Sequence, residues 1–116
     1  GHATHAQAPQ QFVDAPAAAI RRVLDKACWT AQDVDLYEVN EAFAVVTLVT
    51  LQELGISRDR LIVRGGACAL GLPVGAPGAR MLVTLIHALR QRGLRRGMAS
   101  LCLGGGEATA VAIELC

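Results

Sequence analysis

Apolar residues recur at helical spacing in three segments of the chain, and each segment predicts a helix. The three segments are residues 14–27, 41–54 and 79–91. The first begins with Asp14 and Pro16, a side chain that can cap a helix and a proline suited to its first turn. The second is apolar on nearly every side, which predicts a buried helix that ends at Gly55.

Four short runs rich in β-branched and other apolar residues predict strands. They are residues 34–39, 61–63, 98–103 and 108–115. Strands that alternate with helices predict an α/β domain in which helices cover a mixed, mostly parallel sheet. The short turn before the last strand predicts that the sheet ends in an antiparallel hairpin. Residues 1–13 show no clear period, so we expect a loop there and one domain over residues 14–116.

The composition excludes several classes of protein. Hydrophobic residues make up 53% of the chain, which is typical of a folded domain, and the net charge of +1 does not favour nucleic acid as a partner. The four cysteines lack CxxC spacing and form no zinc-site pattern with histidine, so we expect no metal. No segment resembles a signal peptide or is apolar over a membrane-spanning length, which favours a reduced, cytoplasmic setting without membrane partners.

Positive charge is concentrated in the second half of the chain. Residues 58–116 contain eight arginines and three acidic residues, and four of the arginines lie close together. These four are Arg90, Arg92, Arg95 and Arg96. One interpretation is a helix end, where cations interact favourably with the helix dipole. The other interpretation is a contact with phosphate or another polyanion.

Three segments could carry chemistry, and each also has a purely structural interpretation. Asn40 begins a strand-to-helix junction, where ligands bind in open α/β sheets, but it is also a residue type that caps helices. Residues 65–78 are rich in glycine and lead into a helix, although their spacing matches neither a P-loop nor GxGxxG. Cys102 precedes three glycines at the end of a strand, where a thiol either faces a cleft or packs as an inert residue.

In this order and at these intervals, the three segments resemble the thiolase family, acyltransferases that make or cleave 3-ketoacyl-CoA. Residues 40–44 are similar to the family's NEAFA motif, and residues 102–106 are similar to its Cys-x-Gly-Gly-Gly motif. Residues 65–80 are similar to its GGAxALGHPxGxSGAR motif, with Leu72 in place of histidine and Pro77 in place of serine. The resemblance covers residues 9–116 and looks closer to the biosynthetic acetyl-CoA acetyltransferase branch.

The resemblance implies a protein of two similar α/β halves, each with a five-stranded mixed sheet. This chain would be most of the second half, starting at or after its first strand, which we expect at the centre of the sheet. The N-terminal half, with the nucleophilic cysteine, would lie outside the chain. The substrate would be an acyl-CoA thioester with no further cofactor, and the family usually assembles as homo-oligomers.

The resemblance also implies roles for individual residues. Asn40 would orient a water in an oxyanion hole, and Cys102 would remove or return the α-proton of acetyl-CoA. Gly71, Gly104 and Gly105 would lie in the substrate and oxyanion region. Leu72 occupies the position of the histidine that activates the nucleophile, and leucine can neither accept a proton nor donate a hydrogen bond to an oxyanion.

Three functions are therefore compatible with the sequence. The first is part of a thiolase that acts on 3-ketoacyl-CoA thioesters, and the second is a non-catalytic thiolase-like domain kept for thioester binding or assembly. The third is a small nucleotide-binding module, but the glycine spacing that it needs is not found. Because the nucleophile lies elsewhere and position 72 is leucine, we expect the 116-residue chain to be inactive by itself.

Overall fold

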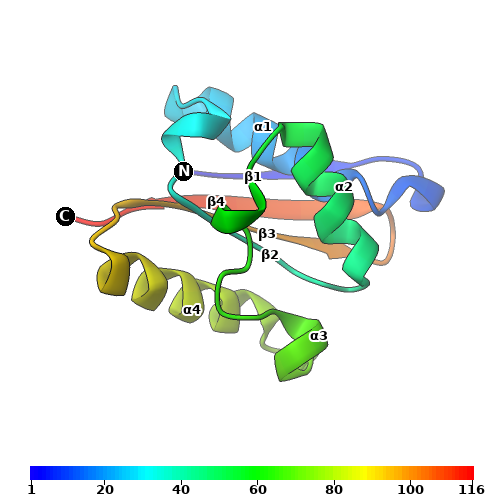
Figure 1. Cartoon of the computed structure of the whole chain (residues 1–116). Coiled ribbons are helices and arrows are strands. Elements are labelled where there is room, and N and C mark those ends of the chain that lie inside the picture. Colours follow the sequence, from blue (N-terminus) through cyan, green and yellow to red (C-terminus); the bar gives the residue numbers. More distant parts are fainter.

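One mixed sheet with helices on both faces forms the core of the computed structural model, which describes residues 1–116 (Figure 1). The strands are β1 (His2–Ala6), β2 (Leu36–Val39), β3 (Arg96–Leu103) and β4 (Glu107–Glu114), in the order β1-β4-β3-β2. β2 pairs parallel with β3, whereas β4 pairs antiparallel with both β3 and β1. The predicted α/β class and the final antiparallel hairpin are confirmed.

Helices α1 (Ala15–Ala27) and α2 (Ala44–Leu54) cover one face of the sheet, and α4 (Pro77–Arg92) covers the other (Figure 1). A four-residue helix, α3 (Ala67–Leu70), precedes α4, and short 3₁₀ turns occupy Pro9–Gln11, Ala31–Asp33 and Arg58–Arg60. None of the helices has the length and apolar character needed to cross a membrane.

Two hydrophobic cores result, one on each face of the sheet. Side chains alternate along β2, so Tyr37 and Val39 belong to the core under α1, while Leu36 belongs to the core under α4. All four residues of β2 are buried because both faces of this strand are covered. β2 is therefore a fully buried strand although it is the last strand of the sheet.

The predicted helix ends agree with the structure in part. Gly55 and Gly93 end α2 and α4 in the left-handed conformation, as expected for residues after a helix. Asp14 occupies the position before α1, but its side chain makes no capping hydrogen bond. Pro77 lies in the first turn of α4, where a missing N–H costs nothing.

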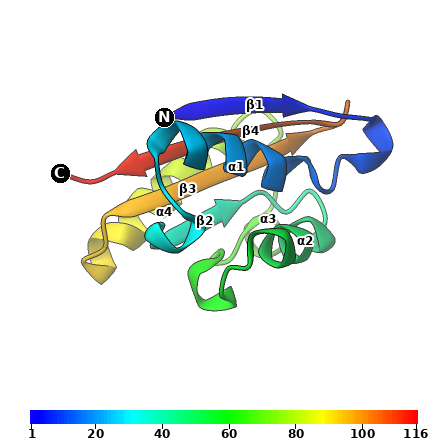
Figure 2. The same cartoon turned by 90° about the horizontal axis from the view of Figure 1, so that it is seen from above.

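The prediction of a loop over residues 1–13 is wrong, because His2–Ala6 form strand β1 at the edge of the sheet (Figure 2). β1 is an edge strand with polar residues on its exposed face, so it lacks the apolar run by which buried strands are found. Two α1 side chains cover its outer edge: Arg22 donates to the carbonyl of Thr4 at 3.1 Å, and Lys26 to that of His2 at 3.0 Å. The sheet therefore begins before residue 14, and its first strand lies at the edge rather than at the centre.

The predicted strand at residues 61–63 is reduced to a single parallel bridge between Leu61 and Tyr37. Ile62 donates its N–H to the carbonyl of Tyr37 at 2.9 Å, but its φ of 49° turns the chain away from the sheet. This left-handed conformation is unfavourable for a β-branched residue, and nothing in an apolar triplet signals it.

The second helix also differs from its prediction. α2 begins at Ala44 rather than at residue 41, and its buried residues are confined to one side. Phe43, Val45 and Leu48 are 61%, 49% and 58% exposed, so the expectation of an all-round buried helix is wrong for this chain.

Candidate active site

The carboxyl ends of β2 and β3 lie side by side, because these two strands run parallel. Asn40 directly follows β2, and its backbone N–H donates to the carbonyl of Ser100 in β3 at 2.9 Å. Cys102 lies two residues further along β3. Two of the residues predicted for the site are thus brought to neighbouring positions on one rim of the sheet, where ligands collect in α/β folds.

Asn40 does not cap a helix. The residue before α2 is Phe43, and the backbone over residues 40–43 is not helical. The Asn40 residue is only 4% exposed, and its Oδ1 is buried without a hydrogen-bond partner. A buried amide oxygen without a partner is unfavourable by about 1–3 kcal/mol, so Asn40 Oδ1 is left free to accept a hydrogen bond from a water or a ligand.

Cys102 has a half-buried free thiol that packs partly against the core under α1. Burial raises the pKa of this thiol, and a backbone hydrogen bond at Cys102 opposes the effect. The thiol is therefore protonated at neutral pH, and a base or a cation from outside this environment is needed before it can act as a thiolate.

The three glycines after Cys102 form a tight turn between β3 and β4. Gly106 has a φ of 86°, and a Cβ there would lie 2.4 Å from the carbonyl oxygen of Gln7. Only glycine fits at this position, and the turn is held to the segment after β1 by the Gln7 N–H, which donates to Gly106 at 3.0 Å. Gly104 and Gly105 are exposed beside Cys102.

The glycine-rich segment approaches the same rim from the α4 side. Gly71 ends α3, and Leu72, which is 42% exposed, begins the connection to α4. At the start of α4, a Cβ added to Gly78 would be 3.6 Å from Leu101, the residue before Cys102. The start of α4 therefore lies against β3 next to Cys102, while the approach of Leu72 to Asn40 and Cys102 stays a prediction.

Sequence reasoning missed three charged residues behind the rim. Glu38, on β2, is 2% exposed and accepts a hydrogen bond from Arg80 of α4 at 3.2 Å. Burial raises the pKa of Glu38 to about 7, against the opposing effect of Arg80. Glu41 accepts a hydrogen bond from the backbone N–H of Cys68 at 2.9 Å. A charged residue in an otherwise apolar strand was the available signal for Glu38.

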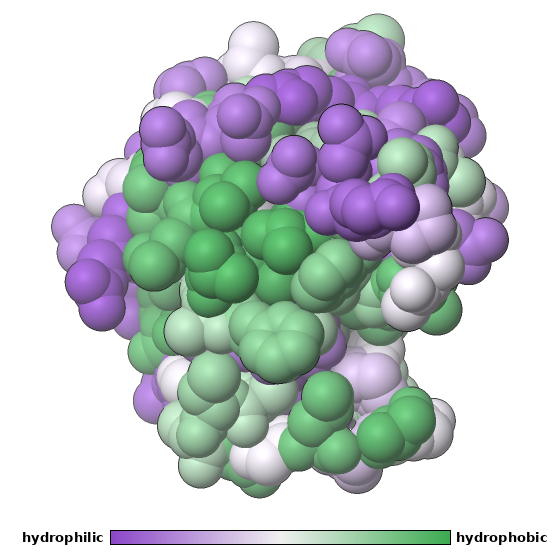
Figure 3. Space-filling view, turned by 90° about the vertical axis from the view of Figure 1, so that its right-hand side faces the viewer, coloured by the Kyte–Doolittle hydropathy of each residue, from purple (hydrophilic) through white to green (hydrophobic).

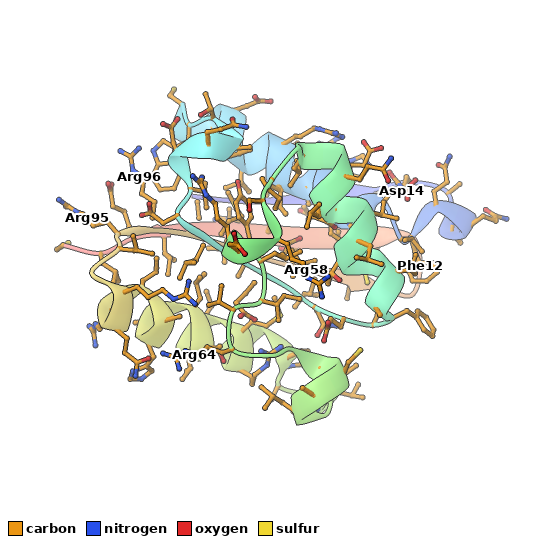
Figure 4. All side chains as sticks on the ribbon, viewed as in Figure 1. Phe12, Asp14, Arg58, Arg64, Arg95 and Arg96 are labelled. Carbon is orange, nitrogen blue, oxygen red and sulfur yellow. The ribbon has the colours of Figure 1, made fainter.

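The arginine-rich region lies at the opposite end of the molecule, near the termini (Figure 4). Arg90 and Arg92 fall in the last turn of α4, as the helix-dipole interpretation predicts. Arg96 pairs with Glu114 at 3.0 Å and stacks on Trp29 at 4.7 Å. Arg95 donates to the carbonyl of Leu115, and Arg64 contacts Gln91. Two of the four clustered arginines, Arg95 and Arg96, therefore have side-chain partners within the chain.

An apolar surface lies beside the rim, at the end of the molecule where α2 and α3 are found (Figure 3). The large exposed side chains on these segments are Phe43, Val45, Leu48, Leu70, Leu72 and Val74. Phe43 also stacks edge-to-face on Phe12 with ring centres 6.1 Å apart. Exposed apolar side chains gathered in this way usually mark a contact with another chain or domain. No group of three or more His, Cys, Asp or Glu residues is placed to hold a metal ion.

Comparison with known proteins identifies the family. A family model described as the C-terminal domain of thiolase matches residues 1–115. An acetyl-CoA acetyltransferase from Chromobacterium violaceum is 47% identical over 114 residues, which cover 98% of this chain and 29% of that protein. A probable acetyl-CoA acetyltransferase from Dictyostelium discoideum is also 47% identical, with 28% of its length covered.

Solved structures agree with this family. The acetyl-CoA acetyltransferase of Bacillus anthracis superposes with a TM-score of 0.95 at 45% identity, over 98% of this chain and 29% of that one. A thiolase from Ascaris suum, solved in complex with coenzyme A, superposes with a TM-score of 0.93 at 41% identity, over 100% and 30%. The chain thus spans less than a third of the relatives that it matches. It belongs to the thiolase family and corresponds to the C-terminal domain.

Proposed function

We propose that this chain is the C-terminal part of an acetyl-CoA C-acyltransferase that acts on acyl-CoA and 3-ketoacyl-CoA thioesters. The observation that carries the proposal is the rim itself, where the buried, unpaired amide oxygen of Asn40 adjoins the strand that bears Cys102. Relatives named acetyl-CoA acetyltransferase and a related thiolase solved with coenzyme A support the substrate class. No metal or organic cofactor is required by this chemistry.

In the proposed reaction, Cys102 exchanges a proton with the α-carbon of acetyl-CoA. In the condensation direction its thiolate removes that proton, and the enolate carbon attacks an acyl group held as a thioester on a cysteine of the upstream half. A carbon–carbon bond forms, the carbon–sulfur bond to that cysteine breaks, and 3-ketoacyl-CoA is released. Asn40 supports the enolate oxygen through a water, and the exposed amides at Gly104 and Gly105 line the substrate region together with Gly71.

Leu72 weakens this chemistry. The leucine side chain cannot act as a base for the nucleophile or donate to an oxyanion, and the loss of one such donor typically lowers the rate by about 10²–10³. The raised pKa of Cys102 adds a second requirement for an activating group. These two features favour a second candidate, a thiolase-like domain that has lost catalysis and retains thioester binding or a role in assembly.

Turnover of acetoacetyl-CoA with coenzyme A separates the two candidates. The 116-residue chain should show none, with or without Leu72→His, because the nucleophile lies outside it. In a full-length protein that carries this chain, Leu72→His should raise turnover by about two orders of magnitude or more. Leu72→Gln is the matched control, since it adds a polar group without an imidazole base. Turnover by the chain alone would exclude this mechanism, and an unresponsive full-length Leu72→His variant would favour the binding function.

The proposal also includes a partner, an assembly and a location for the protein. The upstream thiolase half is the partner expected to cover the apolar surface of α2 and α3, and assembly into homo-oligomers follows from the family. A cytoplasmic location is supported by the mouse and rat relatives, which are named cytosolic acetyl-CoA acetyltransferases.

A further inference from the structure

We propose that Glu41 is a positioning residue that fixes the glycine-rich segment, and with it position 72, against the carboxyl end of β2. The inference rests on the proposed function, because it assigns Glu41 a part in building that site. Glu41 would not touch the reacting atoms and would act through the backbone of residues 66–68.

The first observation is a contact between two segments that are distant in the sequence. The Glu41 carboxylate accepts a hydrogen bond from the backbone N–H of Cys68 at 2.9 Å. Glu41 directly follows Asn40, and Cys68 lies four residues before Leu72. A charge-assisted hydrogen bond therefore joins the Asn40 junction to α3, the short helix that leads to position 72.

The second observation is a steric match between Glu41 and Gly66. A Cβ at Gly66 would lie 2.6 Å from Glu41 Oε2 and 3.0 Å from a methyl group of Ile62. The backbone of Gly66 has φ −110°, which other residues adopt readily, so the glycine is needed for space rather than for conformation. The carboxylate of Glu41 thus occupies the volume that any larger residue at position 66 would fill.

The third observation concerns the far end of the same segment. Arg80, in the first turn of α4, donates to Glu38 at 3.2 Å, and Glu38 lies only two residues before Asn40. The glycine-rich segment is therefore attached at Cys68 and again at Arg80 to carboxylates that flank Asn40. Leu72 lies in the chain between these two attachments. The distance between the two carboxylates therefore determines how far position 72 can extend toward the rim.

Hydrogen exchange of the 116-residue chain tests the contact without any reference to activity. Glu41→Ala should speed the exchange of the Cys68 amide by about tenfold or more, since the loss of about 1.4 kcal/mol of protection is a factor of ten. Glu41→Gln keeps an acceptor oxygen and should restore most of the protection. Gly66→Ala should reproduce the Glu41→Ala result by displacing the carboxylate. The control Glu53→Ala removes an exposed carboxylate from α2 and should leave Cys68 unchanged.

Kinetics of a full-length Leu72→His protein test the consequence for the site. Glu41→Ala should lower kcat by about tenfold to a hundredfold with little change in KM for acetoacetyl-CoA, and Glu41→Gln should recover most of it. Unchanged exchange at Cys68 in Glu41→Ala, or an equal loss of kcat in the alanine and glutamine variants, would overturn the inference. Faster exchange together with an inactive Leu72→His protein would instead refute the proposed function and leave the positioning contact supported.

Discussion

Glu38 shows how the fold changes the chemistry of one side chain. A carboxyl that is almost fully buried between the sheet and α4 is expensive to ionise, and one guanidinium, from Arg80, offsets only part of this cost. The negative charge of Glu41 also disfavours ionisation of Glu38 and raises its pKa. The same principle applies to Cys102, whose burial keeps the thiol protonated until another group activates it. At this rim, loss of solvent therefore changes the pKa values of Glu38 and Cys102 more than their hydrogen bonds or charged neighbours do.

The stability of the chain should depend on pH through Glu38. Its pKa is about 7 in the folded protein against an ordinary value of 4.5, so the folded state binds the extra proton between these values. Its contribution to stability is complete below about pH 4.5 and is lost as the pH rises through 7, by about 3 kcal/mol at most. Urea unfolding at pH 5 and pH 8 should show this decrease for the native sequence.

Glu38→Gln isolates this effect from other titrating groups. The glutamine variant should lose much less stability between pH 5 and pH 8 than the native chain, because it has no proton to release at this position. Glu53→Gln, which removes an exposed carboxylate, should retain the pH dependence of the native chain. Parallel pH profiles for the native chain and Glu38→Gln would show that Glu38 ionises normally.

At the scale of elements, the sequence predicted the helices and the later strands better than the first strand. Apolar periodicity located α1, α4 and β3 to within a few residues, because their buried faces are set by this chain alone. It missed β1, whose place depends on pairing with β4 at the far end of the chain. It predicted a strand over residues 61–63, where the structure has a single bridge at Leu61. The left-handed conformation of Ile62, which ends the pairing, has no local signal in the sequence.

The candidate site was also predictable only in part. Three motifs indicated Asn40, position 72 and Cys102, and the parallel pairing of β2 with β3 brings two of them to one rim. The supporting contacts of Glu38 and Glu41 were not predicted, since they join residues 27 and 42 positions apart in sequence. Apolar periodicity also predicted that α2 is buried on all sides, because periodicity reports which residues are apolar and not whether this chain supplies a surface to cover them.

Alanine substitutions in α2 should reveal its one-sided packing. Val46 is fully buried, and Val46→Ala should lower the free energy of unfolding by about 2 kcal/mol through lost burial and a small cavity. Leu48 is 58% exposed, and Leu48→Ala should change stability by less than about 0.5 kcal/mol. Chemical denaturation of both variants measures the difference. Equal losses would mean that α2 is packed on all sides in solution.

The whole molecule combines a well-formed sheet with one incompletely covered end. The outer edge of β1 is covered by Arg22 and Lys26, and the outer edge of β2 meets the chain at Leu61 and Ile62, so the sheet offers little to a partner strand. The exposed apolar residues of α2 and of the segment around α3 lie instead at the rim that carries Asn40 and Cys102. Gathered exposed apolar residues of this kind usually mark a contact with another chain or domain.

The 116-residue chain should therefore associate through this apolar surface when no upstream half is present. Sedimentation over a range of concentrations should detect the association, and Leu48→Gln should weaken it without lowering stability, because it removes apolar area that contributes to contacts between molecules. Val83→Gln is the matched control: Val83 is also 58% exposed but lies on α4, away from the surface of α2 and α3. An equal effect of the two substitutions would show that association depends on general apolar exposure rather than on this surface, and a chain that stays monomeric would show that the surface is too small to act without the rest of the protein.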